Sequence, residues 1–277
     1  MKSTALIALL ALLGCCFAMR QQSVAVTGKL RCGTSPASGV SVKLWDEDDG
    51  DLGIDPDDLL SQGFTDAQGF FHLKGSEREL TSIDPVLKVY HNCGEKVKIG
   101  QRKVKFRIPK SYISEGGHPI RTFDIGVINL ETIFAQEERD FMRFLLALTI
   151  VGCSLSIRQQ TVAVSGRLIC GDKSAVGVSV MLFDEDDGLD VDDILDEGYT
   201  DASGRFFLTG SERELTNIDP VVKVYHDCDD GMVPGQRKLK FYIPDAYISS
   251  GRVAKKVFNL GVINLQTIFP SEGRNFL

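Results

Sequence analysis

Histidine and cysteine residues recur with the same spacing at two places in this chain of 277 residues. His91 precedes Cys93 by two positions, and His226 stands in the same relation to Cys228. A histidine can act as a general base or a metal ligand, and a cysteine can act as a disulfide partner or thiolate ligand. Because no second histidine or nucleophile recurs with either pair, we predict neither a catalytic nor a metal site. The sequence favours neutral, hydrogen-bonded histidines, with His91 and His226 kept as candidate binding residues.

Basic side chains alternate with apolar ones over residues 103–108 and 238–243. This period of two is typical of a strand with one buried face. A row of cations could contact anionic lipid head groups, but lysine on a solvent-facing edge strand also discourages aggregation. The sequence favours the second interpretation. If a binding face exists, its candidate residues are Lys103, Lys105, Arg107, Lys238, Lys240 and Tyr242.

Acidic side chains gather in residues 46–58 and 184–197. Carboxylate oxygens bind calcium, but neither segment has the register of an EF-hand loop. We therefore expect solvated acidic loops, with weak calcium binding as the alternative. The chain has neither a phosphate-binding loop nor a dinucleotide-binding fingerprint, so we predict no cofactor. The net charge of −7 argues against nucleic acid as a partner.

Two copies of one unit must position these residues, because the sequence repeats itself. Residues 20–28 match residues 158–166, and residues 63–134 match residues 198–269. The second copy is shorter in its acidic loop, where a change of length is tolerated. We predict a signal peptide (1–18), a first domain (19–135), a linker resembling a second signal peptide (136–156) and a second domain (157–277).

The junction between the domains resembles the N-terminus of the chain. Lys2, an apolar run over 5–13 and small residues before 19 predict a secretory signal. Residues 141–156 show the same design, and the apolar run 144–151 is too short to span a bilayer. The sequence favours a second signal peptide, meaning two secreted proteins joined end to end. A hydrophobic linker helix and a membrane anchor are the alternatives.

The cysteines outside these apolar segments form one pair in each domain, Cys32 with Cys93 and Cys170 with Cys228. The repeat leaves one intradomain pairing for each, and secretion favours disulfide bonds. Free buried thiols or half of a metal site are the alternatives.

Short alternating segments separated by turns predict an all-β fold of two β-sandwich domains. Residues 24–32, 40–44 and 104–108 alternate in this way, as do their counterparts in the second copy. Ser76 and Glu79 have the spacing of a capping box, which predicts a helix start there.

The ordered motifs in each copy resemble the nematode transthyretin-like family. They are Val-x-Gly-x-Leu-x-Cys-Gly, then Thr-Asp-x-x-Gly-x-Phe, Gly-Ser-Glu-x-Glu-Leu-Thr-x-Ile-Asp-Pro, Lys-Val-Tyr-His-x-Cys and Arg-Lys-x-Lys-Phe. The resemblance implies an extracellular protein with two tandem transthyretin-like (Ig-like or prealbumin-like) sandwiches of seven or eight strands. Gly100 and Gly235 stand where many members have a further cysteine, so we expect one disulfide bond in each domain.

The resemblance implies a secreted, non-enzymatic binding or adaptor module. Its expected partner is a hydrophobic ligand or a cell-surface lipid or protein. A hydrolase of the 5-hydroxyisourate type shares the fold, but its histidine near the N-terminus and its Tyr-Arg-Gly-Ser terminus are absent here. A structural component of the extracellular matrix is a further alternative. A homo-oligomer formed through edge strands is an expectation from fold analogy alone.

Overall fold

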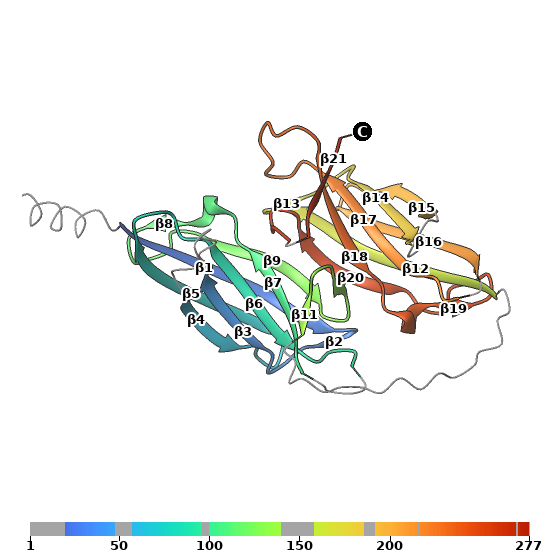
Figure 1. Ribbon diagram of the computed structural model, residues 1–277, viewed down its shortest axis with the longest axis horizontal. Coiled ribbons are helices and arrows are strands. Elements are labelled where there is room, and N and C mark those ends of the chain that lie inside the picture. Colours follow the sequence, from blue (N-terminus) through green and yellow to red (C-terminus); the bar gives the residue numbers. More distant parts are fainter. Residues whose placement is uncertain are drawn as a thin grey trace, which may run out of the picture.

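The computed structural model describes residues 20–47, 57–95, 100–139, 158–185, 192–214, 216–269 and 271–276. Two β-sandwiches follow one another along these residues, which confirms the predicted fold class (Figure 1). The helices among the described residues are short 3-10 turns. The predicted leader, most of the predicted linker, most of the first acidic loop and residues 186–191 of the second lie outside the described residues.

The two halves contain matching series of elements. The first half consists of β1 (Arg20–Cys32), β2 (Ser35–Pro36), β3 (Ser41–Asp46), β4 (Asp58–Phe64), β5 (Phe70–Glu79), β6 (Pro85–His91), β7 (Arg102–Arg107), η1 (Lys110–Tyr112), β8 (Ser114–Glu115), β9 (Thr122–Asn129), β10 (Ile133–Phe134) and β11 (Glu138–Arg139). The second half consists of β12 (Arg158–Cys170), β13 (Lys173–Ser174), β14 (Ser179–Asp184), β15 (Asp193–Tyr199), β16 (Arg205–Glu214), β17 (Pro220–His226), β18 (Gln236–Tyr242), η2 (Asp245–Tyr247), β19 (Ser249–Ser250), β20 (Phe258–Asn264) and β21 (Gly273–Asn275). The repeat in the sequence is therefore also a repeat in the structure.

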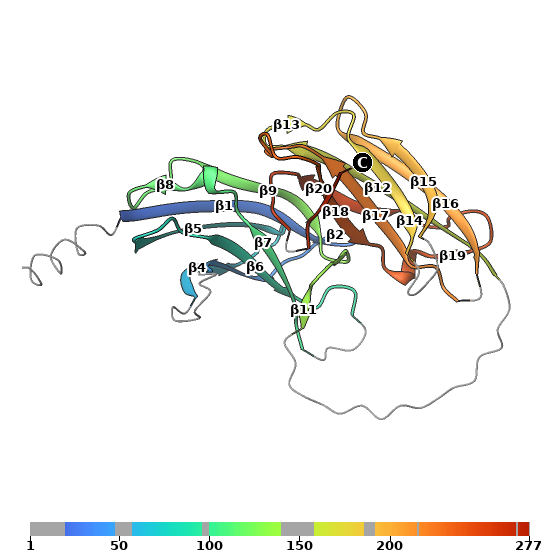
Figure 2. The ribbon, with the colours of Figure 1, turned by 45° about the horizontal axis from the view of Figure 1, so that its top comes forward.

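Each half has two sheets packed face to face (Figure 2). In the first half one sheet contains β5, β1 and β9, and the other has the order β4, β3, β6, β7. Buried and more exposed residues alternate along the strands because successive side chains point to opposite faces of the sheet. In β3, for example, Val42 and Leu44 are buried between the sheets, whereas Lys43 is partly exposed. The second half repeats this arrangement with β16, β12 and β20 against β15, β14, β17 and β18.

Apolar side chains from both sheets fill the space between the layers. Val24, Val26 and Leu30 of β1 belong to one cluster with Leu87 of β6 and Phe106 of β7, and none of them is exposed. Burying aliphatic and aromatic side chains of this size contributes roughly 1.5–3 kcal/mol each. The core is therefore the main source of stability in each half.

One disulfide bond lies at the end of β1 and another at the end of β12. Cys32 bonds Cys93, which follows β6, and Cys170 bonds Cys228, which follows β17. The bonds join residues 61 and 58 positions apart, respectively. Each bond thus ties the first sheet of its half to the second.

Ser76 and Glu79 lie in a strand, so the predicted helix start is wrong. β5 continues through Glu79, and Ser76 pairs with Ser23 while Glu79 pairs with Arg20. A capping box satisfies a few backbone groups locally, whereas the long strand β1 offers partners to this whole segment. The second half repeats the pairing between β12 and β16.

The first sandwich continues past residue 135, where we placed its end. Glu138 and Arg139 form β11, which pairs with β7. Glu137 forms an ion pair with Arg102 at the start of β7. Residues 136–139, which we assigned to the linker, therefore pack on the first half.

The two halves share one continuous sheet. β9 pairs with β20 in antiparallel orientation, and this contact joins the two first sheets into a single ten-stranded sheet (Figure 1). Backbone pairing also crosses the junction beside the other two sheets, which remain separate: Ile133 pairs with Tyr242, and Arg107 pairs with Ile268. Arg107 and Tyr242, two of the candidate binding residues, thus lie at the contact between the halves.

Candidate functional site

The lysines of β7 are already paired with carboxylates. Lys103 Nζ lies 2.7 Å from a Glu138 oxygen, and Lys105 Nζ lies 2.9 Å from a Glu47 oxygen. Glu47 also binds Lys88 at 2.7 Å. Burial works to raise the pKa of Glu47, but the hydrogen bonds and charges of Lys88 and Lys105 outweigh it and hold this pKa below its usual value. These cations stabilise the fold and do not form a free row on the surface.

Of the two equivalent lysines in β18, one is paired with a carboxylate and the other lies over an aromatic ring. Lys240 forms an ion pair with Glu185. Lys238 Nζ lies 5.9 Å from the centre of the Tyr225 ring. Burial and the neighbouring lysines lower the pKa of Lys238. The structure therefore brings the predicted basic residues of each half together on one strand, but most of their charge is compensated there.

His91 and His226 lie in the interior, each only 3% exposed. Nδ1 of His91 accepts a hydrogen bond from the Cys93 backbone N–H at 3.2 Å, and its Nε2 has no partner among the described residues. Burial first, and the charge of Arg102 second, lower the pKa of His91 to about 3. Burial and Arg237 likewise lower the pKa of His226 to about 3. Both histidines are neutral at neutral pH and shielded from any substrate in solution.

A buried arginine at the start of β7 was not among the predicted residues. Arg102 donates hydrogen bonds to the carbonyl oxygens of Cys93, Leu130 and Thr132 at 2.9–3.1 Å. Its guanidinium also binds both carboxylate oxygens of Glu137. The equivalent arginine of the second half makes the same bonds. This arginine holds the disulfide loop, the end of β9 and the segment before β11 together.

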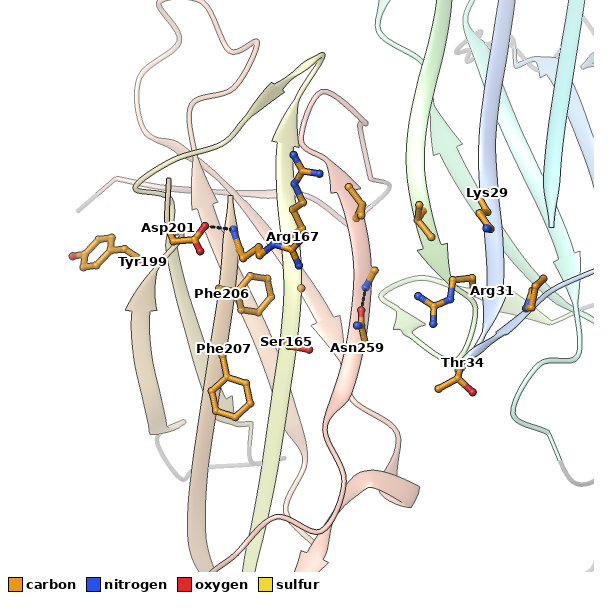
Figure 3. Close-up of a pocket in the computed structure, with 16 residues that line it drawn as sticks. Lys29, Arg31, Thr34, Ser165, Arg167, Tyr199, Asp201, Phe206, Phe207 and Asn259 are labelled. Atoms are coloured by element: carbon orange, nitrogen blue, oxygen red, sulfur yellow. Dashed lines mark hydrogen bonds between the residues drawn. The ribbon is translucent and has the colours of Figure 1, made fainter. Parts of the chain in front are cut away.

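A groove of about 870 Å³ lies where the two halves meet (Figure 3). β1 contributes Lys29 and Arg31 to its lining, β12 contributes Arg167, and β16 begins with Arg205. Lys29 and Arg31 flank the buried Leu30, so the period of two places them on the outer face of the ten-stranded sheet. Cations from both halves thus line one groove.

Apolar side chains lie between and beside these cations. Val127 of β9 and Val262 of β20 pair with each other at the junction and line the groove. Phe206 and Phe207 of β16 and Tyr199 at the end of β15 line its second-half side (Figure 3). Phe207 is 58% exposed and Tyr199 is 74% exposed. The groove therefore combines an apolar surface with positive charge.

Two of the four cations, Arg167 and Lys29, contact neutral groups that do not compensate their positive charge. Arg167 donates to the Ser203 carbonyl oxygen at 2.9 Å and to Ser174 Oγ at 3.1 Å. Lys29 Nζ lies 4.7 Å from the centre of the Phe70 ring. Neither contact supplies a negative charge.

Arg31 and Arg205 form no ion pair with a carboxylate in the part of the chain that the structure describes. Asp201 is the one acidic residue that lines the groove. Its Oδ1 accepts the backbone N–H groups of Arg205 and Ser203, both at 2.8 Å. The bond from the Arg205 N–H first, and a bond from the Ser203 hydroxyl second, hold the pKa of Asp201 below its usual value. The groove carries an excess of positive charge that suits an anionic group.

One group of possible metal ligands lies among the described residues. Cys32, Cys93 and Glu131 lie close enough together to share an ion, but the two sulfur atoms are bonded to each other. Within the described ranges, no helix has the length and apolar character needed to cross a bilayer.

The fold and its cystines define a tandem of two small, disulfide-bonded β-sandwich domains. A model of the transthyretin-like family matches residues 27–109 and 165–244, which lie in the first and second halves respectively. The chain belongs to the transthyretin-like family and contains two copies of its unit.

Curated relatives from Caenorhabditis elegans each match about half of this chain. Transthyretin-like protein 46 is 60% identical over 135 residues, which are 48% of this chain and 74% of the relative. Transthyretin-like protein 5 is 44% identical over 138 residues, or 49% of this chain and 99% of the relative. Transthyretin-like protein 33 is 48% identical over 124 residues, or 45% of this chain and 87% of the relative. A whole relative of this kind corresponds to one half of the present chain.

Proposed function

We propose that the protein is an extracellular, non-enzymatic binding module whose groove between the two halves holds an anionic amphiphile. The observation that carries this proposal is the pair Arg31 and Arg205. They enter the groove from opposite halves, and neither forms an ion pair among the described residues. Val127, Val262 and Phe207 supply apolar surface beside them.

An acyl chain with a carboxylate or phosphate head group is the ligand class that fits this lining. Guanidinium groups bind carboxylate and phosphate oxygens through two parallel hydrogen bonds. Aliphatic and aromatic side chains contact the apolar chain without directional demands. This ligand class narrows the expected hydrophobic ligand to one that also carries negative charge.

The extracellular location rests on the cystines and on the predicted leader. Disulfide bonds persist in oxidising compartments and are rare in the cytosol. Each half contains one cystine. The segment that precedes residue 19 has the design of a secretory signal.

Burial of the shared histidines favours binding over hydrolysis. His91 and His226 are the histidines found at equivalent positions of both copies, and both are 3% exposed. A general base must lie within hydrogen-bond reach of the proton that it removes. Neither histidine lines the groove.

Calorimetric titration with laurate, dodecyl phosphate and dodecanol tests the proposal. We expect both anions to bind and the neutral alcohol to bind at least tenfold more weakly. Comparison of laurate with dodecyl phosphate identifies which head group the groove prefers. Equal binding of dodecanol would contradict the proposal.

The double variant Arg31→Gln with Arg205→Gln localises the site. Losing two charged contacts, one from the partly exposed Arg31 and one from the exposed Arg205, at about 1 kcal/mol each should weaken laurate binding about 30-fold. The control is Arg78→Gln with Arg252→Gln, which removes the same charge from two exposed positions outside the groove. Unchanged affinity in the groove variant, or an equal loss in the control, would refute the assignment.

A further inference from the structure

Each half of this chain carries a self-complementary face. We propose that this face, and not the connection through residues 140–157, holds the two halves together, and that either half can pair with a second copy of itself through it. The inference concerns the assembly of the protein and is independent of the groove ligand. Its evidence is a two-fold symmetry that runs through every class of contact at the junction.

The strand pairing at the junction is symmetric. Val127 of β9 pairs with Val262 of β20, and these valines occupy equivalent positions of the repeat. On either side, Gly126 pairs with Ile263 and Ile128 pairs with Gly261. Gly126 is equivalent to Gly261 and Ile128 to Ile263, so exchanging the two halves leaves this set of pairs unchanged. Such an exchange is characteristic of a two-fold interface. The two-fold axis passes between the valines.

Side-chain hydrogen bonds obey the same symmetry. Asn129 Nδ2 donates to the carbonyl oxygen of Asn259 at 2.8 Å, and Asn264 Nδ2 donates to that of Asp124 at 2.7 Å. Asn129 and Asn264 are equivalent in the repeat, and both are only 2% exposed. The acceptors are backbone oxygens, so the bonds do not depend on whether Asp124 or Asn259 occupies the acceptor position.

A pair of tyrosines repeats this exchange at the edge of the interface. Tyr112 donates to an oxygen of Gln266 at 2.8 Å, and Tyr247 donates to an oxygen of Glu131 at 2.5 Å. Gln266 and Glu131 are equivalent positions, and either side chain offers an acceptor oxygen.

Four phenylalanines form the apolar part of the interface. Phe134 and Phe269 stack across the junction with ring centres 6.2 Å apart and planes 9° apart. Phe106 contacts Phe269 at 5.7 Å, and Phe241 contacts Phe134 at 6.1 Å. All four rings are buried. Since the same two phenylalanines come from each half, a second copy of either half would supply identical rings.

Glycine at the centre of β9 and β20 is required by the interface itself. Gly126 has φ +90° and Gly261 has φ +102°. A Cβ built on Gly126 would collide with the Val262 carbonyl oxygen, and one on Gly261 would collide with that of Val127. Each half thus lacks a side chain where the other half's backbone approaches.

A chain with a specific protease site inserted within residues 140–157 tests the proposal. After complete cleavage, we expect the halves to migrate as one particle with the mass of the uncut protein in size-exclusion chromatography with light scattering. Native mass spectrometry after equilibration should then show three kinds of dimer: two first halves, two second halves, and one of each. Separation of the halves on cutting would overturn the proposal, and exclusive recovery of the mixed pair would overturn its self-pairing part.

Glycine variants of the cleaved protein locate the contact. Gly126→Ala with Gly261→Ala should raise the dissociation constant of the cut halves at least 100-fold. Gly116→Ala with Gly251→Ala is the matched control, because these glycines have φ +90° and +101° with no atom within 4 Å of the added Cβ. The control should leave the halves associated. Equal association of both variants would overturn the proposal.

A charge exchange at the two-fold axis provides a second test that does not alter the backbone. Val127→Glu with Val262→Glu places like charges directly opposite each other and should separate the cut halves. Val127→Glu with Val262→Lys places opposite charges there. The cut halves of this variant should bind each other at least tenfold more tightly than those of the double glutamate variant. Retained association in the double glutamate variant, or failure of the glutamate–lysine pair to recover it, would refute the assignment of the axis.

Discussion

Acidification should destabilise both halves through their buried histidines. The pKa of His91 and of His226 is about 3 in the folded protein, below the ordinary value of 6.5. Between these values the unfolded chain binds more protons than the folded chain. The stabilisation is therefore fully present above pH 6.5 and is lost as the pH falls toward 3. From about pH 7.5 to about pH 5.5, the free energy of unfolding should fall by about 1.4 kcal/mol for each half.

Urea unfolding at several pH values measures this loss. We expect His91→Gln with His226→Gln to remove the pH dependence in that window, whatever its effect on stability at neutral pH. The matched control is His72→Gln with His118→Gln, since both of these histidines are exposed. The control should keep the full dependence. A test variant that retains the slope of the unaltered protein would refute the reasoning, because the titrating groups would then lie elsewhere.

Two further sets of substitutions test the polar and covalent links of the first half. Arg102→Met leaves the buried carboxylate of Glu137 unpaired and should lower the free energy of unfolding by about 3–5 kcal/mol; adding Glu137→Met should recover part of this in urea titrations, and no recovery would contradict the pairing. Cys32→Ala with Cys93→Ala should cost about 4 kcal/mol by the chain-entropy argument for a long loop. Calorimetry should show a lower melting temperature that returns to the original value in neither reducing nor oxidising buffer, whereas an unchanged transition would contradict that argument.

The fold could be predicted from the alternation of apolar and polar residues in the sequence. Alternation over residues 24–32 and 104–108 predicts strands that the structure contains, because a period of two is sufficient to define the buried face. The capping-box spacing at Ser76 failed for a related reason. It is a local signal of about 1 kcal/mol, and a ten-residue pairing with β1 outweighs it.

The candidate site was much harder to predict. Lys103 and Lys105 have the pattern of a solvent-facing strand, but Glu47 and Glu138 come from distant parts of the chain and cover them. Ion pairs between residues far apart in the sequence produce no local pattern from which they could be predicted. The groove was missed because it depends on the contact between the halves.

One available signal pointed to that contact. Gly126 and Gly261 lie inside strands at equivalent positions, each between two apolar residues. A glycine inside a strand often marks a close approach of another backbone, and here that backbone belongs to the other half. The sequence could therefore have located the contact, although not the direction in which the strands pair.

The pairing of β9 with β20 has a consequence for behaviour at high concentration. An open strand edge presents unpaired backbone groups on which further chains can assemble into fibres. Here each half covers the corresponding edge of its neighbour, and the symmetric contact consumes both edges at once. Growth through this edge ends at two units, so the same contact that builds the shared sheet also prevents its extension along this route.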